Sequence, residues 1–212
     1  MAARLPAAYR ARIQAYWSEF GISSRAVRAR RLPLFIEAQR LQPVGLGSDG
    51  RDKLLVPGAA AAWAAMRMAA SDDAIDLLLV SAFRSVDFQA GLIRNKLAKG
   101  REIAEILTVN APPGCSEHHT GRAVDIGVAG CPPLEEEFDQ TAAFHWLTAN
   151  ARRFGFTMTY PKGNPEGYLY EPWHWCWKKL GGPVRPEQDR AVLGADISIS
   201  DQQTCTSEKS FA

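Results

Sequence analysis

Residues 116–127 read SEHHTGRAVDIG, and they join a turn-rich loop to a short apolar strand. The loop carries His118, and the strand carries Asp125 between apolar neighbours. A carboxylate buried in such a strand needs a partner, and a cation is the most effective one. Imidazole and carboxylate are both good zinc ligands, so the pair predicts part of a metal site. For this pair alone, a surface histidine and a capping aspartate are the alternative.

A second polar pair interrupts an aromatic run. Residues 168–177 read YLYEPWHWCW, which predicts a strand that pairs with residues 156–160 in a hairpin with a long loop. Glu171 and His174 do not share one face of a regular strand, but Pro172 interrupts the pairing. We therefore expect a bulge or an edge strand to bring the two side chains to one point. The alternative is an aromatic hairpin with a core-facing histidine and an exposed glutamate.

A third element is the segment SAFRS, residues 81–85, at the end of an apolar run. Arg84 sits where a predicted strand gives way to a helix, and an arginine there can hold a carboxylate or stabilise an oxyanion. A surface ion pair is the alternative. Two histidines and one aspartate that bind a metal leave a fourth position for water, and a free glutamate can take the proton of that water.

Hydrophobic patterns elsewhere alternate between helices and short strands. We expect helices over residues 7–20, 58–70, 86–99, 101–108 and 139–153, strands over 76–83, 123–130, 156–160 and 168–177, and an irregular connection over 33–58. Strands separated by helices in mixed order and ending in a hairpin predict an α+β domain. The expected architecture is a single domain with a mainly antiparallel sheet covered by helices.

Composition sets outer limits on the kind of protein. The chain has 212 residues, of which 46% are hydrophobic and 23% charged, with a net charge of +2. These values exclude a fully disordered chain, a collagen-like fibre and a disulfide-knotted miniprotein. No apolar run is long enough to span a membrane. The first 17 residues contain no continuous apolar segment, so we predict no signal peptide and a cytoplasmic protein, or a periplasmic or envelope protein if a leader is missing.

Positive charge gathers near the start of the chain. Residues 1–51 hold nine arginines, and four of them crowd between Arg25 and Arg31. A patch for nucleic acid or an anionic polymer is one interpretation. A solvated helix face is favoured, because no aromatic interleaving or binding motif accompanies the arginines, so we expect no nucleic-acid partner.

The four cysteines form no C-x-x-C pair, which argues against a zinc ribbon. They are Cys115, Cys131, Cys176 and Cys205.

The three chemical elements occur in a fixed order, namely SAFRS with Gln89, then SEHHTGRAVDIG, then GYLYEPWHW. Together they resemble the VanY-like D-alanyl-D-alanine carboxypeptidases, zinc peptidases of bacterial cell-wall metabolism that are related to lysostaphin-type enzymes and to the hedgehog signalling domain. The resemblance implies a hedgehog/D,D-peptidase-like fold. It divides the chain into a basic N-terminal helical arm (1–53), a zinc peptidase catalytic domain (54–180) and a polar C-terminal tail (181–212).

The resemblance also implies roles for five residues. His118, Asp125 and His174 would hold one zinc ion per chain. Glu171 would act as general base on zinc-bound water, and Arg84 would stabilise the oxyanion of the scissile carbonyl.

Further residues of the same motifs have less direct roles. The resemblance implies that Ser116 and Gln89 line the pocket for the terminal D-amino acid. His119 is not a motif position. We expect it either to have no role in the site or to contact a metal ligand without binding the metal itself. Cys176 departs from the family pattern, which usually has a basic residue there, and we favour packing over metal binding for its thiol.

The implied activity is zinc-dependent hydrolysis of the terminal D-alanine amide in a peptidoglycan stem peptide or precursor. An L,D-carboxypeptidase or a peptidoglycan endopeptidase would use the same site on a different bond. A zinc-stabilised binding module without turnover, as in hedgehog-like domains, is the alternative from another class of protein.

Overall fold

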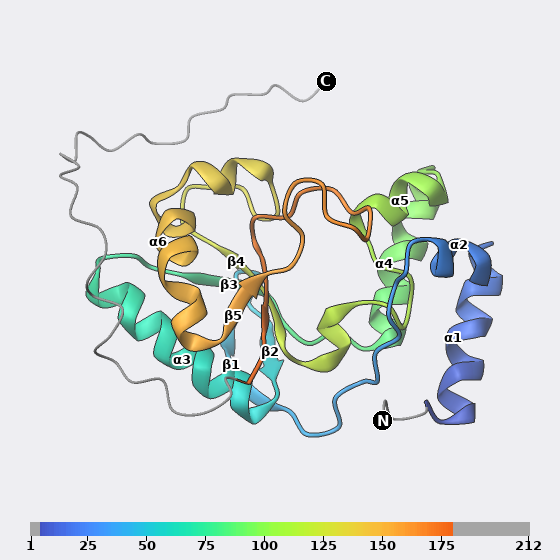
Figure 1. The fold of residues 1–212 in the computed structure, drawn as a ribbon, viewed down its shortest axis with the longest axis horizontal. Helices are drawn as coiled ribbons and strands as arrows, with labels where there is room; N and C mark the ends of the chain where they lie inside the picture. Colours follow the sequence, from blue (N-terminus) through green and yellow to red (C-terminus); the bar gives the residue numbers. More distant parts are fainter. Residues whose placement is uncertain (1–4, 180–212) are drawn as a thin grey trace.

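The computed structural model describes residues 5–179, so Cys205 and the tail expected over 181–212 lie outside the described residues. A four-stranded sheet runs through the centre, with helices on both sides (Figure 1). Its strands lie in the order β3 (Leu78–Ser81), β4 (Ala123–Gly127), β6 (His174–Trp177) and β5 (Phe156–Met158). Every neighbouring pair is antiparallel. The predicted α+β class with a mainly antiparallel sheet is confirmed.

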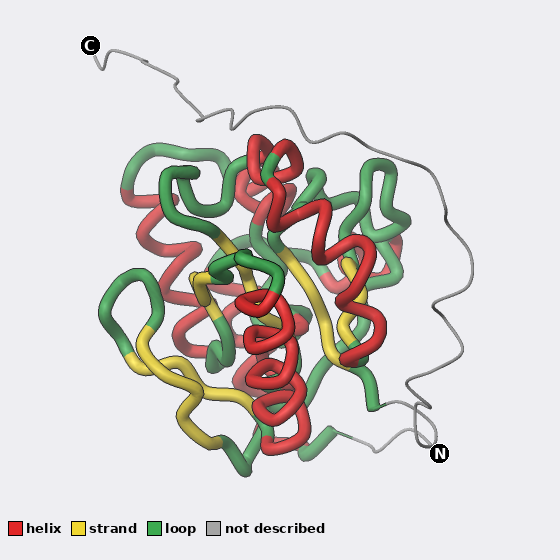
Figure 2. Tube along the Cα trace, turned by 90° about the vertical axis from the view of Figure 1, so that its left-hand side faces the viewer, coloured by secondary structure: helices red, strands yellow, loops and turns green. Residues whose placement is uncertain are grey.

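Two helices, α3 (Pro57–Asp72) and α6 (Ala142–Asn150), cover one face of the sheet and form a core with it. In the view of Figure 2, helices lie in front of the strands. Ile126 of β4 and Trp175 of β6 join Trp63 of α3 in this core. Because side chains alternate along a strand, the intervening Asp125 and His174 point to the opposite face. The polar side chains of the two central strands are thereby directed away from this core.

Four helices enclose a second core on the other side of the molecule. They are α1 (Ala7–Glu19), α2 (Ser24–Ala29), α4 (Val86–Ala98) and α5 (Ile103–Val109). Ile13 and Trp17 of α1 are buried there beside Ile93 of α4. The indole Nε1 of Trp17 donates to the carbonyl oxygen of Pro113 at 2.9 Å. The N-terminal helices therefore pack against the loop that precedes residues 116–127.

The irregular connection expected over residues 33–58 is wrong in part. It contains a two-stranded antiparallel hairpin made of β1 (Gln42–Leu46) and β2 (Asp52–Leu55). The glycines that predict an irregular chain form the turn of this hairpin. Gly50 has φ +72, and the backbone nitrogen of Gly47 donates to the carbonyl oxygen of Arg51. The part of the chain that the structure describes also contains three short 3-10 helices, namely η1 (Glu117–Thr120), η2 (Glu136–Gln140) and η3 (Ala151–Phe154).

The expected strand over residues 168–177 is shorter than predicted. Only β6 at its end is a strand, and β6 lies between β4 and β5 rather than at an edge. A turn replaces the expected bulge: the backbone nitrogen of His174 donates to the carbonyl oxygen of Glu171 at 3.1 Å. The tight reversal at Pro172, where the proline nitrogen has no hydrogen to donate, brings Glu171 and His174 together. The hairpin between β5 and β6 is confirmed.

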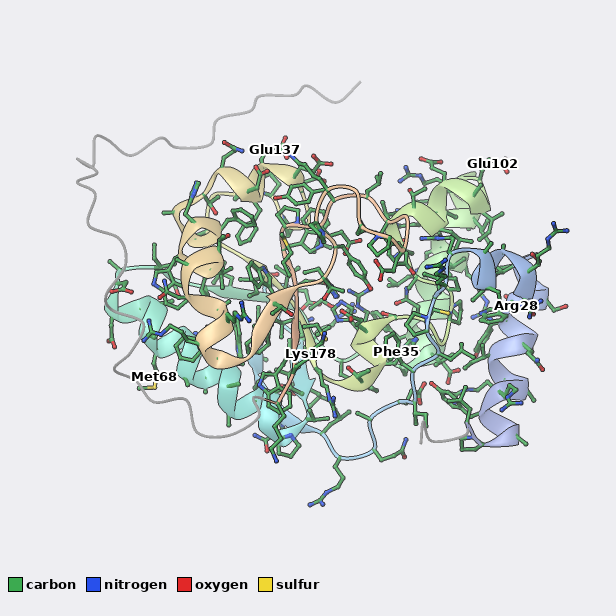
Figure 3. All side chains as sticks on the ribbon, viewed as in Figure 1. Arg28, Phe35, Met68, Glu102, Glu137 and Lys178 are labelled. Atoms are coloured by element: carbon green, nitrogen blue, oxygen red, sulfur yellow. The ribbon has the colours of Figure 1, made fainter. Side chains whose placement is uncertain are left out.

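The arginines of α2 and of the residue that follows its end are of two kinds. Arg25 and Arg28 are exposed, and Arg28 points outward from the molecule (Figure 3). Arg30 instead lies over the Tyr168 ring, at 4.5 Å from its centre, and donates to the carbonyl oxygens of Glu166 and Leu107. Arg30 is thus a structural side chain.

Within residues 5–179, no helix combines the length and apolar character needed to cross a bilayer.

Candidate active site

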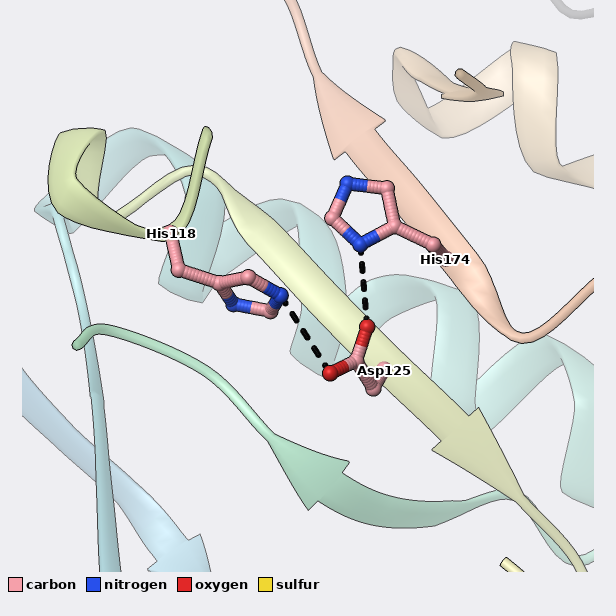
Figure 4. A group of neighbouring side chains, drawn as sticks. All are labelled: His118, Asp125 and His174. Atoms are coloured by element: carbon pink, nitrogen blue, oxygen red, sulfur yellow. Dashed lines mark hydrogen bonds and ion pairs between the residues drawn. The ribbon is translucent and has the colours of Figure 1, made fainter. Parts of the chain in front are cut away.

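Three side chains that can bind a metal meet where β4 and β6 begin to pair. His118 comes from η1, Asp125 from the middle of β4, and His174 from the start of β6 (Figure 4). Their ligand atoms all lie within 4.8 Å of one another, and all three residues are at most 2% exposed. Asp125 Oδ1 lies 2.9 Å from His174 Nδ1, and Oδ2 lies 3.2 Å from His118 Nε2. We call these three residues the triad.

Local backbone structure explains this meeting. Gly121 has φ +63, a conformation that glycine adopts without strain, and it turns the chain from η1 into β4. The register of the sheet then places Asp125 directly opposite His174. The backbone nitrogen of Arg84 donates to the carbonyl oxygen of His118, which ties η1 to the end of β3. Residues far apart in sequence are thereby fixed around one carboxylate.

His118 is prepared to act as a neutral ligand. Its Nδ1 lies 2.6 Å from the carbonyl oxygen of Ala82, which can only accept, so Nδ1 carries the proton. Nε2 then carries a lone pair, which lies beside Asp125 and Arg84. Burial, followed by the nearby Arg84 charge, lowers the pKa of His118 to about 4. A backbone carbonyl that fixes the tautomer in this way is typical of histidines that bind metals.

His174 lies between two carboxylates. Its Nδ1 faces Asp125, and its Nε2 lies 3.0 Å from Oε2 of Glu117. Burial opposes its charge, but the hydrogen bonds to Asp125 and Glu117 prevail and raise the pKa of His174 to about 10. The Nδ1 proton occupies the lone pair that a metal would take, and metal binding would release it. The ring of Tyr160 stacks on the imidazole, with 4.8 Å between the ring centres.

Arg84 reaches the triad from the end of β3. Its Nη2 lies 2.6 Å from Asp125 Oδ2 and 2.6 Å from His118 Nε2. Its Nε donates to Ser81 Oγ at 3.0 Å, and its Nη1 donates to Gln89 Oε1 at 3.4 Å. Burial raises the pKa of Asp125, but its interactions with His118 and with the Arg84 guanidinium outweigh this effect and hold that pKa well below its usual range. The guanidinium therefore balances the buried carboxylate.

Glu171 lies beside the triad without belonging to it. Its Oε2 is 4.0 Å from Nδ1 of His174, and its side chain is 12% exposed. Its backbone nitrogen donates to the carbonyl oxygen of Tyr160, which anchors the turn. Burial raises the pKa of Glu171 to about 7. A carboxylate with a pKa near neutrality is well suited to both accept and return a proton.

All seven residues singled out from the sequence line one cleft of about 400 Å³. They are Arg84, Gln89, Ser116, His118, Asp125, Glu171 and His174. Gln89 is 1% exposed, and its Nε2 donates to the carbonyl oxygen of Ala111 at 3.0 Å. Since its Oε1 accepts from Arg84, Gln89 holds that guanidinium in place. Ser116 is buried at the wall of the cleft.

Sequence reasoning missed Glu117, which has no motif position of its own. Its side chain is 14% exposed, and only the folding of the chain brings it to His174, which is 57 residues away in the sequence. His119 fits the expected supporting role: its Nδ1 donates to the carbonyl oxygen of Arg84, and its Nε2 accepts from the backbone nitrogen of Gly114. Cys176 is buried, and burial raises the pKa of its thiol, so it packs as a protonated side chain.

A buried triad of two histidines and one aspartate, with a free glutamate beside it in a cleft, is the arrangement of a mononuclear metallopeptidase. Residues 52–180 match the family model of VanY, D-alanyl-D-alanine carboxypeptidase. The chain belongs to this family.

One relative is a D-alanyl-D-alanine carboxypeptidase of Enterococcus faecalis, which is 33% identical over 117 residues. The match covers 50% of this chain and 42% of the relative, so the chain spans less than half the length of that curated protein.

Two solved structures have the same fold. The LdcB LD-carboxypeptidase superposes with a TM-score of 0.60 at 32% identity, over 68% of this chain and 71% of that one. A variant of the vancomycin-resistance D,D-pentapeptidase VanY in complex with Zn(II) superposes with a TM-score of 0.52 at 27% identity, over 70% of this chain and 88% of that one. The family therefore includes a protein whose structure contains zinc.

Proposed function

We propose that this protein is a zinc-dependent carboxypeptidase that hydrolyses the terminal D-alanine amide of peptidoglycan stem peptides or their precursors. The observation that carries the proposal is the buried triad with Glu171 at 4.0 Å from His174, in one cleft. The family assignment and the zinc-containing relative support the same chemistry.

The residues present fit one zinc ion. Two imidazoles and one carboxylate form the donor set, and Nε2 of His118 and Nδ1 of His174 both face Asp125. Nη2 of Arg84 contacts two of the same ligand atoms, so it would yield those contacts to the metal while Ser81 and Gln89 retain the guanidinium. We therefore propose His118, Asp125 and His174 as the ligands of a single zinc.

The chemistry assigns distinct tasks to the remaining side chains. When bound, zinc supplies a Lewis acid that polarises a carbonyl and makes water more acidic. Glu171 accepts a proton from the attacking water and returns it to the leaving amine as the C–N bond breaks. Arg84 stabilises the negative charge that develops on the carbonyl oxygen. The products are the shortened peptide carboxylate and free D-alanine, without a covalent enzyme intermediate.

We further infer a division of the chain. Residues 54–180 form the catalytic unit, and residues 1–53 form an arm that braces it with α1 and α2, although this arm also contains β1 and the start of β2. The burial of Ile13 and the hydrogen bond from Trp17 to Pro113 support a bracing role, because residue 113 lies just before the loop that carries His118. The assignment of 181–212 as a tail remains a prediction from the sequence.

A second candidate is an L,D-carboxypeptidase, because LdcB superposes with the higher TM-score of the two structures. The deciding experiment incubates the purified full chain with pentapeptide and tetrapeptide stems, with and without chelator, and identifies the products by mass. We expect metal-dependent release of D-alanine from the pentapeptide. Cleavage of the tetrapeptide alone would favour the L,D-activity, internal cleavage an endopeptidase, and zinc binding without cleavage a binding module.

Replacing Glu117 with alanine is expected to weaken metal binding. Glu117 accepts the Nε2 proton of His174 and so orients that ring toward the metal. Loss of such an outer partner typically lowers metal affinity about 10–100-fold. Competition with a chromophoric chelator measures this affinity without any assay of activity. Glu135→Ala, in the wall of the cleft, is the matched control, and equal affinities of both variants would contradict the role of Glu117.

A further inference from the structure

Lys96 is a cation in the cleft without a protein partner. Its half-buried side chain lines the cleft, and within residues 5–179 its ammonium takes part in no hydrogen bond or ion pair. The two other cations of the same cleft are paired, Arg84 with Asp125 and Arg101 with Glu105. Glu171 and Glu105 lie near enough to act on Lys96 through their charge, but neither forms an ion pair with it. An ammonium that has lost part of its water without such a pair can bind an anion from outside.

The surroundings of Lys96 strengthen this tendency. Partial burial, and after it the charge of Arg101, lower the pKa of the Lys96 ammonium, which reflects lost hydration beside another cation. A carboxylate bound there would reverse both effects, since charge-assisted hydrogen bonds are the strong ones. The site therefore favours a ligand with negative charge over a neutral one.

Helix geometry places Lys96 at a defined distance from the chemistry. Gln89 and Lys96 are seven residues apart on α4, so both project from the same face of the helix, about 10 Å apart along its axis. Gln89 contacts Arg84 and so marks the catalytic end. Lys96 thus lies further along the cleft than the triad, within reach of a group on a peptide whose scissile bond is at Arg84.

Another part of the lining carries negative charge. Glu135 and Glu136, just before and at the start of η2, line the same cleft and are exposed. An anionic group of a bound peptide would be repelled by these carboxylates and attracted to α4. The polarity of the cleft therefore fixes which side of a peptide faces Lys96.

We propose that Lys96 binds a free carboxylate of the substrate peptide and thereby selects acidic peptides. The inference rests on the proposed function and deepens it by naming a determinant of specificity. Two sources share this chemistry: the terminal α-carboxylate, and a side-chain carboxylate further along the peptide. Arg84 is assigned to the carbonyl oxygen of the scissile bond and Arg101 is paired with Glu105, so Lys96 is the cation of the cleft available to such a group.

The test measures peptide binding in a Glu171→Gln background by calorimetry, with zinc present, so that turnover does not interfere. Lys96→Met keeps most of the aliphatic stem and removes the charge. The matched control is Lys99→Met, because Lys99 is exposed on the same helix end and does not line the cleft. Three ligands are compared: a stem peptide with both carboxylates free, its C-terminal amide, and a peptide amidated at the side-chain carboxylate.

We expect Lys96→Met to weaken binding of the free peptide about tenfold or more, and Lys99→Met to leave it unchanged. Amidation of the carboxylate that Lys96 holds should weaken binding to the parent and abolish the difference between parent and Lys96→Met, which identifies the source. Equal affinities of parent and Lys96→Met, an equal loss for all three ligands, or no binding of any peptide would overturn the proposal. Release of D-alanine by the Glu171-containing chain tests the proposed function separately.

Discussion

Replacing Glu171 with alanine is expected to reduce hydrolysis of the pentapeptide about 10²–10⁴-fold while the metal stays bound. Glu171 lies next to the triad but outside it, 4.0 Å from Nδ1 of His174, so its loss removes a proton acceptor and leaves all three proposed ligands. Within residues 5–179, no other carboxylate at or beside the triad is equally available, because Asp125 is engaged by Arg84 and His174, and Glu117 by His174.

Two measurements together test this prediction. Metal content of the purified variant shows whether the triad is intact, and the rate of D-alanine release shows whether the base is lost. Glu137→Ala is a suitable control, because Glu137 is exposed at the outer surface of the molecule, on η2 (Figure 3). Full activity with a full complement of metal would disprove the role of Glu171 as base. Loss of metal along with activity would instead make Glu171 a ligand.

The elements that carry the site were predictable because each has a local signal. The apolar strand around Asp125 shows the period of a strand, and glycines such as Gly155 mark helix ends where the chain takes a positive φ. The motifs around His118 and His174 identify the candidate side chains of the metal site. The register that places Asp125 opposite His174 then follows from burying alternate residues of both strands in the core.

Other features depend on contacts between distant parts of the chain, which a local pattern does not contain. Glu117 meets His174 across 57 residues, and Trp17 meets Pro113 across 96. The hairpin of β1 and β2 escaped prediction because its glycines and prolines are typical of loops as well as of bulged strands. The sequence predicts a bulge or an edge strand at Pro172, where the structure has a turn, because the sequence does not reveal that β6 is a central strand.

For Asp125, the sequence predicts the buried position of the side chain better than it predicts which cation the side chain contacts. From sequence, Asp125 was a buried carboxylate in need of a cation. Its actual surroundings hold several candidates for that cation, since Arg84 contacts Oδ2 and a protonated His174 contacts Oδ1. The protein fold therefore supplies positive charge to Asp125 from its own side chains, and the metal proposed here would share in that task. Because Asp125 contacts Arg84 and His174 within the protein and would also bind the metal, it is important for stability as well as for metal binding.

Replacing Asp125 with asparagine is accordingly expected to have two large effects. Metal binding and hydrolysis should fall below detection, because the anionic ligand shared by the two histidines is lost. In the metal-free protein, Arg84 would lose its carboxylate partner at a site where Asp125 is 1% exposed. Breaking a buried ion pair by removing one partner typically costs about 3–5 kcal/mol of unfolding free energy.

Urea unfolding in the presence of chelator measures the second effect without any contribution from bound metal, and metal content with D-alanine release measures the first. Asp72→Asn is the matched control, because Asp72 is exposed at the end of α3 and should change stability by no more than about 0.5 kcal/mol. A variant at Asp125 that kept both its metal and its activity would refute the proposed ligand set. Unchanged stability without metal would show instead that the contact with Arg84 contributes little to folding, and the electrostatic account of the site would then be wrong.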